Sequence, residues 1–146
     1  MADRNDPYAG YNFSIELDGI TRAGFRECSG LENSQDAGEY REGTDKNLSV
    51  RKIPGLVTHG DVTLSRGITN DSKLWEWREK VAKGGVERHD ISIKLCDDTG
   101  NARITWNLFD CWPKQWTGPS LNATSNEVAV EQLVLVYERI EVDQWA

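Results

Sequence analysis

The sequence lacks the long apolar segments that membrane insertion and secretion require. No stretch of its 146 residues approaches the ~20 consecutive apolar residues that span a bilayer. The polar N-terminal segment, Met1 to Pro7, has no apolar run of the kind found in signal peptides. We therefore expect a protein that is not anchored in a membrane by this chain and that is assembled in the cytoplasm.

Cysteine and basic residues are both scarce. The cysteines, Cys28, Cys96 and Cys111, are odd in number and far apart, which favours reduced, buried thiols over a disulfide framework. Seventeen Lys and Arg residues stand against 24 Asp and Glu residues, so the net charge is −7. This charge disfavours binding to nucleic acid or to an anionic membrane surface, because both are negatively charged.

Motifs for catalysis and metal binding are missing as well. The sequence has no C-x-x-C pair, no G-x-S-x-G and no phosphate-binding glycine loop after a strand. His59 and His89 have no cysteine or carboxylate at metal-ligand spacing, so we interpret both as surface histidines. We therefore expect no catalytic, metal-binding or cofactor-binding residue and no cofactor, and the protein is predicted not to be an enzyme.

One tripeptide keeps an enzymatic alternative open. Asp98-Thr99-Gly100 matches the catalytic tripeptide of aspartic proteases, in which two carboxylates share one proton. A single copy would require a homodimer that uses Asp98 from each chain. The tripeptide lies in a hydrophilic stretch between two regular strand patterns, and this setting favours a simple turn.

One α-helix is predicted, over Asp71 to Val81. Leu74, Trp77 and Val81 recur at helical spacing and should form a buried stripe, which Trp75 widens. The polar residues 69–72 can accept hydrogen bonds from the first free amides, and Gly84-Gly85 ends the helix. Glu76 and Lys80 are four residues apart and should form an exposed ion pair.

In the remaining chain, apolar and polar residues alternate as in β-strands, and turn-forming residues separate these stretches. Asp18-Gly19 predicts a hairpin between the first two strands, and residues 97–101 predict another turn. A change of phase between Val130 and Leu133 predicts a bulge in the last strand. Residues 112–119 are predicted to be an irregular connection. We predict one domain over residues 1–146 that is mainly β, an antiparallel β-sandwich or partial barrel with one α-helix. The predicted strands of its body cover residues 11–17, 20–28, 60–66, 89–95, 102–109 and 127–142.

Residues 32–53 form the most polar section of the chain. We expect two strands joined by a tip rich in Gly, Asn and Asp, with Pro54-Gly55 as a turn after them. The strands carry too few apolar residues to be buried by their own subunit. Two interpretations stay open: a mobile surface hairpin, or an arm that pairs with another subunit, because exposed strand edges are templates for other chains.

An ordered series of short segments resembles the tail tube proteins of contractile phages and of phage-tail-like contractile injection systems. Each segment is weak alone, but together they follow the family order over nearly the whole chain. The segments are Asp6-Pro7-Tyr8, Tyr11-Asn12-Phe13 with Asp18-Gly19, residues 24–31, 39–43, 52–55 and 64–67 running into 74–77, then 90–93, Trp106 with Trp112-Pro113, and residues 121–131.

The resemblance implies a structural protein that assembles as hexameric rings, which stack into a rigid hollow tube. A surrounding sheath would contract and drive the tube through a target envelope. The implied partners are other copies of this chain, the sheath protein, baseplate and tube-terminating proteins, and cargo or DNA in the lumen. The net negative charge suggests an acidic lumen. The resemblance also implies that the polar hairpin reaches neighbouring subunits, through an interface to which we assign Glu39, Tyr40, Arg41, Gly43, Asp45, Lys46 and Lys52.

Several identities stay open at this point. Phage tails and injection systems share the tube, so the sequence alone does not separate a virion tail from an injection system as the final location. The tube protein of a type VI secretion system is the nearest variant. A homodimeric aspartic protease and a lone β-sandwich binding module are the alternatives from other functional classes.

Overall fold

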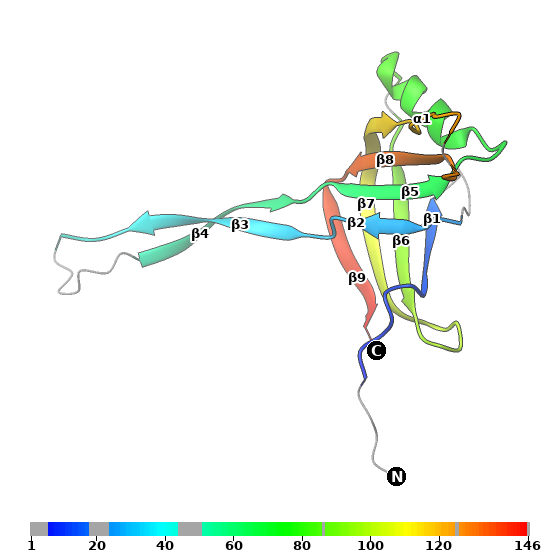
Figure 1. Ribbon diagram of the computed structural model, residues 1–146. Helices are drawn as coiled ribbons and strands as arrows, with labels where there is room; N and C mark the ends of the chain where they lie inside the picture. Colours follow the sequence, from blue (N-terminus) through cyan, green and yellow to red (C-terminus); the bar gives the residue numbers. More distant parts are fainter. Residues whose placement is uncertain (1–5, 18–23, 44–50, 86, 125, 146) are drawn as a thin grey trace, which may run out of the picture.

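Two antiparallel sheets that share one long strand form the body of the protein, and one helix packs beside them (Figure 1). The computed structural model describes residues 6–17, 24–43, 51–85, 87–124 and 126–145. The sheets do not close into a complete barrel. The elements are β1 (Phe13–Leu17), β2 (Glu27–Ser29), β3 (Asn33–Tyr40), β4 (Arg51–His59), β5 (Val62–Gly67), α1 (Lys73–Ala82), β6 (His89–Cys96), β7 (Ala102–Thr117), β8 (Val130–Val136) and β9 (Arg139–Trp145).

Strand β7 connects the two sheets. Its first half pairs with β6 and β9, and its second half pairs with β8. Between the halves, Asp110 has a φ of 57°, a left-handed conformation that Asp tolerates better than most residues. Strand β7 thus passes from one sheet to the other, and the strands lie in the order β1-β6-β7-β8-β5-β2. The mainly β, partial-barrel prediction with one helix is therefore confirmed.

The core lies between the two sheets and the helix. Ile91 and Ile93 of β6 alternate inward, as do Leu133 and Leu135 of β8, as the period-two pattern requires. The same cluster also contains Ile15, Leu17, Val62, Leu64, Leu74, Trp77, Leu108, Cys111 and Tyr137.

The predicted hairpin between the first two strands is wrong. Strand β1 pairs with β6, where Ile15 lies opposite Ile93 and Leu17 opposite Ile91, so buried isoleucine and leucine side chains face each other across the ladder. The second predicted strand shortens to β2, which pairs with β5 in the other sheet. The Asp18-Gly19 turn lies outside the described residues.

Two further strand predictions are corrected. Residues 112–117 continue β7 instead of forming an irregular connection, and a shift of register next to Pro113 accommodates a residue that has no N–H. The last segment breaks at Tyr137 and Glu138, between β8 and β9, and not at 130–133. The apparent change of phase arose because the buried position before Leu133 is occupied by Glu131, a charged residue.

The helix runs over Lys73–Ala82, two residues later than its predicted start. Asp71 Oδ1 accepts a hydrogen bond from the Lys73 amide, so the polar segment before the helix does satisfy a first-turn donor. At the other end Gly84 has a φ of +95°, and the Gly85 amide donates to the Lys80 carbonyl. This pair of features is a Schellman motif, which explains why the two glycines end the helix.

The side chains of the helix follow the predicted faces with two corrections. Trp75 does not widen the buried stripe, because it is 45% exposed and lies against Trp116 at the edge of the sheet. Leu74 and Trp77 are buried, and Val81 packs against the core from the helix end. Glu76 and Lys80 both lie in the described part of the chain, and the predicted ion pair between them is not formed. The Ser72 hydroxyl instead donates to Glu76, and Lys80 Nζ lies 3.5 Å from Glu87.

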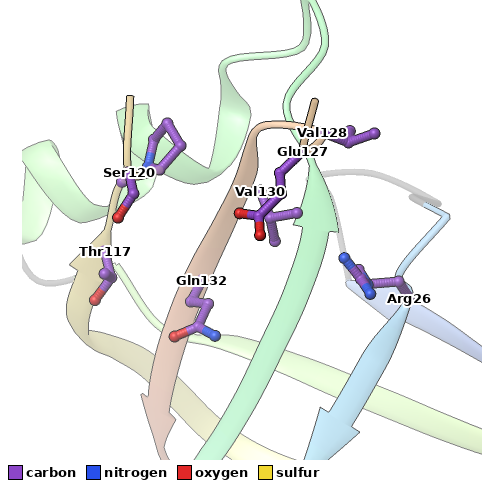
Figure 2. Close-up of a pocket in the computed structure, with 9 residues that line it drawn as sticks. Arg26, Thr117, Ser120, Glu127, Val128, Val130 and Gln132 are labelled. Carbon is purple, nitrogen blue, oxygen red and sulfur yellow. The ribbon is translucent and has the colours of Figure 1, made fainter. Parts of the chain in front are cut away.

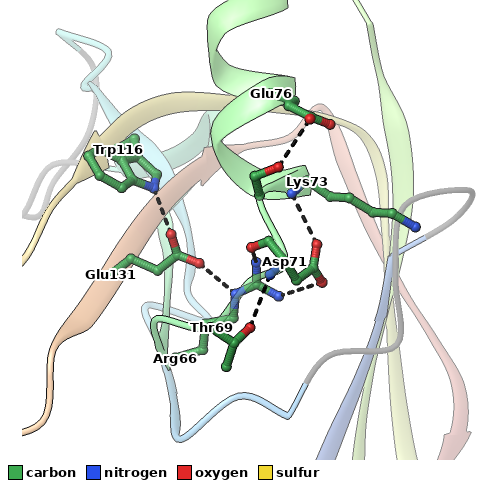
Figure 3. Close-up of polar contacts among 8 residues, drawn as sticks. Arg66, Thr69, Asp71, Lys73, Glu76, Trp116 and Glu131 are labelled. Atoms are coloured by element: carbon green, nitrogen blue, oxygen red, sulfur yellow. Dashed lines mark hydrogen bonds and ion pairs between the residues drawn. The ribbon is translucent and has the colours of Figure 1, made fainter.

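Arg66 joins the start of the helix to the sheet (Figure 3). Its side chain is 5% exposed, and its Nε donates to Glu131 Oε1 over 2.6 Å. Its two terminal nitrogens bond the carboxylate and the carbonyl oxygen of Asp71. The other oxygen of Glu131 accepts the Trp116 indole N–H over 3.1 Å. Strands β5, β8 and β7 and the helix entrance are thus held by one hydrogen-bonded charge cluster.

Asp71 lies at the more exposed end of this cluster. The hydrogen bond from the Lys73 amide lowers the pKa of Asp71, partial burial opposes this effect, and the positive charge of Arg66 lowers the pKa further. Asp71 therefore remains ionised beside Arg66 under neutral conditions.

We expect Glu131→Ala to destabilise the subunit by about 3–5 kcal/mol, because the substitution leaves Arg66 buried without its main counter-charge. Denaturant unfolding of the unassembled subunit measures the change. The matched control replaces both charges, Arg66→Met with Glu131→Leu, and should recover most of the lost free energy. A double variant as unstable as the single one contradicts this account of the cluster.

Trp77→Ala should cost about 3–5 kcal/mol, because Trp77 is 2% exposed and its truncation leaves a large cavity. It also removes the hydrogen bond from the indole N–H to the Glu87 carbonyl. On the same helix Glu76→Gln should cost at most about 0.5 kcal/mol, since its partner Ser72 is exposed. Equal, small shifts of the unfolding midpoint for the two variants would show that Trp77 is not part of the core.

Candidate subunit interface

Strands β3 and β4 form an arm that projects from the body (Figure 1). They pair only with each other among the described strands, and every residue of both is exposed except the half-buried His59 at the base. A two-stranded hairpin with no packed face is marginally stable in water. The arm therefore has the properties of an element that is completed by another chain.

The predicted interface residues lie at the outer end of this arm. Glu39 and Lys52 are directly opposite each other, and Lys52 Nζ lies 2.7 Å from the Glu39 carboxylate. Tyr40 is opposite Arg51, and its hydroxyl donates to Glu42. Arg41 and Gly43 follow β3, whereas Asp45 and Lys46 lie outside the described residues. Since Glu39 and Lys52 are both 62% exposed, their ion pair contributes little to stability, and a neighbouring chain could contact either side chain.

The apolar residues of the arm were missed as interface candidates. Ile53, Leu56 and Val57 are 48%, 77% and 56% exposed, and all three lie on β4. The predicted turn at Pro54-Gly55 concealed Leu56 and Val57, because it placed them outside a strand, and Ile53 was passed over at the end of the predicted strand. In the structure β4 continues through this dipeptide, opposite a shift of register between Gln35 and Ala37. The apolar residues on both sides of the dipeptide were the available sequence signal.

The second sheet, formed by β2, β5, β8 and the second half of β7, has two open edges and one free face. Strand β2 has no partner on its outer side, and the second half of β7 pairs only with β8 among the described strands. The face opposite the core carries mainly neutral side chains. Its members are Glu27 and Ser29 of β2, Thr63 and Ser65 of β5, Trp112, Gln115 and Thr117 of β7, and Gln132, Val134 and Val136 of β8. Glu27 is the one charged residue in this set.

A polar hollow of about 560 Å³ lies at one end of this free face (Figure 2). Thr117, Val130 and Gln132 line it from the sheet, and Arg26 and Glu127 bring opposite charges from the segments that precede β2 and β8. Its lining contains no cysteine or histidine, and the mixed polar rim resembles an open surface more than an enclosed catalytic pocket.

The remaining reactive side chains are placed by packing. The ring of His59 lies tilted against Tyr137, and that of His89 lies edge-to-face against Trp77, with centroids 5.2 and 5.1 Å apart. The prediction of surface histidines is therefore corrected, because these aromatic neighbours half-bury both. Cys28, Cys96 and Cys111 are free thiols; Cys111 is buried, and the other two are half-buried. Burial raises the pKa of Cys28 to about 11 and that of Cys111 to about 12, which makes both poor nucleophiles.

Within the described ranges, no three His, Cys, Asp or Glu side chains are grouped to hold a metal ion. In the same ranges no helix has the length and apolar character needed to cross a membrane.

Asp98 lies exposed in the predicted turn between β6 and β7. The turn is organised by its neighbour: Asp97 Oδ1 accepts the Thr99 hydroxyl and amide and the Asn101 amide, while Oδ2 accepts Arg103 Nε over 2.8 Å. The Thr99 hydroxyl, and next the Arg103 guanidinium, hold the pKa of Asp97 far below its usual range. The tripeptide is thus part of a rigid exposed turn.

A single helix beside a partial barrel with an exposed β-arm is the architecture that the resemblance to tail tube proteins implied. The family model of the T4-like virus tail tube protein gp19 matches residues 9–141. The chain therefore belongs to the T4-like tail tube protein family, a family of structural tube proteins.

Solved structures give the same result. A chain of the PVC sheath–tube complex, an extracellular contractile injection system in its extended state, is 32% identical, with a TM-score of 0.85 over 96% of this chain and 93% of that chain. A chain of the tube-terminating cap of the anti-feeding prophage is also 32% identical, with a TM-score of 0.87 over 99% and 95%.

More distant likeness extends to secretion proteins. Hcp1 from Flavobacterium johnsoniae is 15% identical, with a TM-score of 0.58 over 91% of this chain and 95% of that chain, which shows a shared fold. Comparison with curated proteins gave no match.

Asp97→Asn should lower the unfolding free energy at pH 7, and the difference from the unaltered protein should shrink in acid. Because the pKa of Asp97 is lowered on folding, its stabilisation is complete above the unfolded pKa of about 3.9 and is lost as the pH falls through the folded pKa. Denaturant midpoints at pH 7 and in increasing acid test this dependence.

Asp98→Asn is the matched control, one residue away, and should leave both stability and assembly unchanged. Cleavage of peptides at acid pH by the unaltered protein, lost in Asp98→Asn, would contradict the structural interpretation.

Proposed function

We propose that this chain is the inner tube subunit of a contractile particle. Hexameric rings of the chain stack into a rigid hollow conduit, which contraction of a sheath drives through a target envelope. The observation that carries this proposal is the family match over residues 9–141, together with 32% identity to a chain of a sheath–tube complex over almost the full length.

The partners follow from the structures that contain the relatives. Those structures are a sheath–tube complex, a tube-terminating cap, a baseplate and a sheath–tube terminator. We assign to this chain the corresponding partners: other copies of itself, a sheath protein, a baseplate and a terminator, with cargo in the lumen. The two relatives at 32% identity favour an injection system over a type VI tube, whose likeness of 15% extends to the fold alone. Assembly is placed in the cytoplasm, with the tube ending in the finished particle.

The shape of the subunit supports a closed ring. Sheet edges at β2 and at the second half of β7 can pair between neighbours, which removes exposed edges. In a ring of such sheets the bulky side must lie outside, where there is more room. The core and α1 occupy one side of the second sheet, so its free face lies toward the lumen.

This orientation changes the expected character of the lumen. The free face carries Ser, Thr, Gln, Val and Trp side chains, with Glu27 as its one charged strand residue and Arg26 and Glu127 as a pair of opposite charges in the hollow at its end. The net charge of −7 therefore belongs mainly to other surfaces, and a neutral, hydroxyl- and amide-rich wall replaces the acidic lumen suggested by composition. Such a wall neither attracts nor repels a charged cargo strongly.

In this proposal the arm contacts neighbouring subunits. The interface includes Glu39, Tyr40, Arg41, Gly43, Asp45, Lys46 and Lys52, extended by the exposed apolar residues Ile53, Leu56 and Val57. A neighbour that covers these side chains would stabilise the hairpin through burial. Residues 1–146 act as one tube unit, and catalysis has no part in the mechanism.

Deletion of residues 43–47 should abolish tube formation while the subunit stays folded, because β3 and β4 pair only with each other among the described strands and the contact of His59 with Tyr137 lies at the opposite end of the arm. Electron microscopy of the purified protein gives the assembly state, and thermal unfolding gives the stability of the subunit. Tubes of normal length from the deletion would exclude the arm as an essential contact.

Charge exchange within the arm is the matched control. Lys52→Glu places two carboxylates opposite each other, and Glu39→Lys added to it restores an opposite pair. If the pair acts only within the arm, the double variant assembles normally. If either residue contacts a neighbour, the double variant stays defective.

A further inference from the structure

Two apolar hollows lie at the two open edges of the second sheet. The first, of about 330 Å³, lies between α1 and the second half of β7, and its lining includes Trp75, Arg78, Ala82, Lys114 and Trp116. Trp75 is 45% exposed and packs edge-to-face on Trp116, with ring centroids 4.9 Å apart. A large indole at the edge of a sheet, half covered by its own subunit, is typical of an interface anchor.

The second hollow, of about 220 Å³, lies beside β2. Phe13, Cys28, Leu31, Leu95 and Trp106 contribute most of its apolar lining. Its volume is below the roughly 300–1,000 Å³ of small-molecule sites, so it suits one large side chain better than a ligand. Leu31 at its rim is 38% exposed, which leaves apolar surface uncovered in the isolated subunit.

The two hollows lie on the same side of the sheet. One cross-strand row runs from edge to edge through Cys28, Leu64, Leu133 and Trp116, and all four belong to the core side. The first hollow adjoins Trp116 at one end of the row, and the second adjoins Cys28 at the other end. When β2 of one copy lies beside β7 of the next, the two cross-strand rows become continuous. The hollow beside β2 of one copy then lies next to the hollow between α1 and β7 of its neighbour.

We infer that Trp75 of each subunit anchors in the hollow beside β2 of the next copy in the ring. The contact rests on the proposed tube function and assigns residues to its ring interface. It is heterologous, with a different surface from each partner, which is the arrangement that closes rings. Burial of the indole against Phe13, Leu31 and Trp106 removes apolar surface from water on both partners.

Truncation of the anchor tests the inference. Trp75→Ala should raise the protein concentration required for tube formation by about 30-fold, which is a hot-spot loss of ~2 kcal/mol converted at 1.4 kcal/mol per tenfold. Trp75→Phe keeps an aromatic ring and should recover most of the assembly. Lys80→Ala alters an exposed position on the same helix outside the hollow and should have no effect. Thermal unfolding of each variant separates assembly from folding.

Cross-linking identifies the occupant of the hollow. Subunits carrying Trp75→Cys are mixed with subunits carrying Leu31→Cys, assembled at a protein concentration above the raised requirement expected for loss of the indole, and treated with a short bis-maleimide reagent. Covalent pairs joining positions 75 and 31 should form in the mixture, and peptide mass spectrometry locates the bond. Tubes that assemble normally from Trp75→Ala, without a 75–31 cross-link in the mixture, overturn the inference.

Two other results have distinct meanings. If Trp75→Ala tubes form normally but no longer bind the sheath protein of the same particle, the hollow between α1 and β7 is a sheath contact and the inference is wrong. If the unaltered chain forms no rings or tubes at all, the proposed function itself fails, and the ring contact fails with it.

Discussion

The buried ion pair between Arg66 and Glu131 is the constraint on which the arrangement of the second sheet and the helix depends. A charge that is 5% exposed is tolerated only when it is paired and hydrogen-bonded, so β5 and β8 must hold the register that places the two side chains 2.6 Å apart. Asp71 extends the same requirement to the residue before the helix, and Trp116 extends it to the end of β7. A change of register in any of these elements would leave a buried charge unsatisfied.

This cluster also explains where sequence reasoning succeeded and where it failed. The helix, the β6–β7 hairpin and the inward faces of β5 and β6 follow from apolar periodicity, because Leu74, Trp77, Ile91 and Ile93 fill the core. The pattern misled at Glu131, where a carboxylate occupies an inward position and hides the regular alternation of β8. Periodicity alone cannot recognise a charge that is buried with a partner 65 residues away in the chain.

Strand pairing was the other part that the sequence could not supply. Asp18-Gly19 is a strong local turn signal, yet β1 pairs with β6 and β2 with β5, because the apolar partners of Ile15 and Cys28 come from distant segments. The candidate interface was predictable in outline from the scarcity of apolar residues in 32–53. The exposed apolar residues Leu56 and Val57 of this interface were missed, because Pro54-Gly55 predicts a turn before them. In the structure β4 continues through this pair, opposite a shift of register in β3.

A tube driven through an envelope must resist bending, and this requirement accounts for features that would weaken an isolated subunit. Open edges at β2 and β7, an arm with no packed face, and an exposed tryptophan beside an apolar hollow each leave groups uncovered among the described residues, and the proposed ring would cover them. Backbone hydrogen bonds between strands around a ring are directional, so they fix the register of neighbouring subunits. Burial of aromatic side chains is not directional, and it adds affinity. In the proposed tube the isolated subunit is the incomplete form of the protein, and the stiffness of the tube comes from the same contacts that complete it.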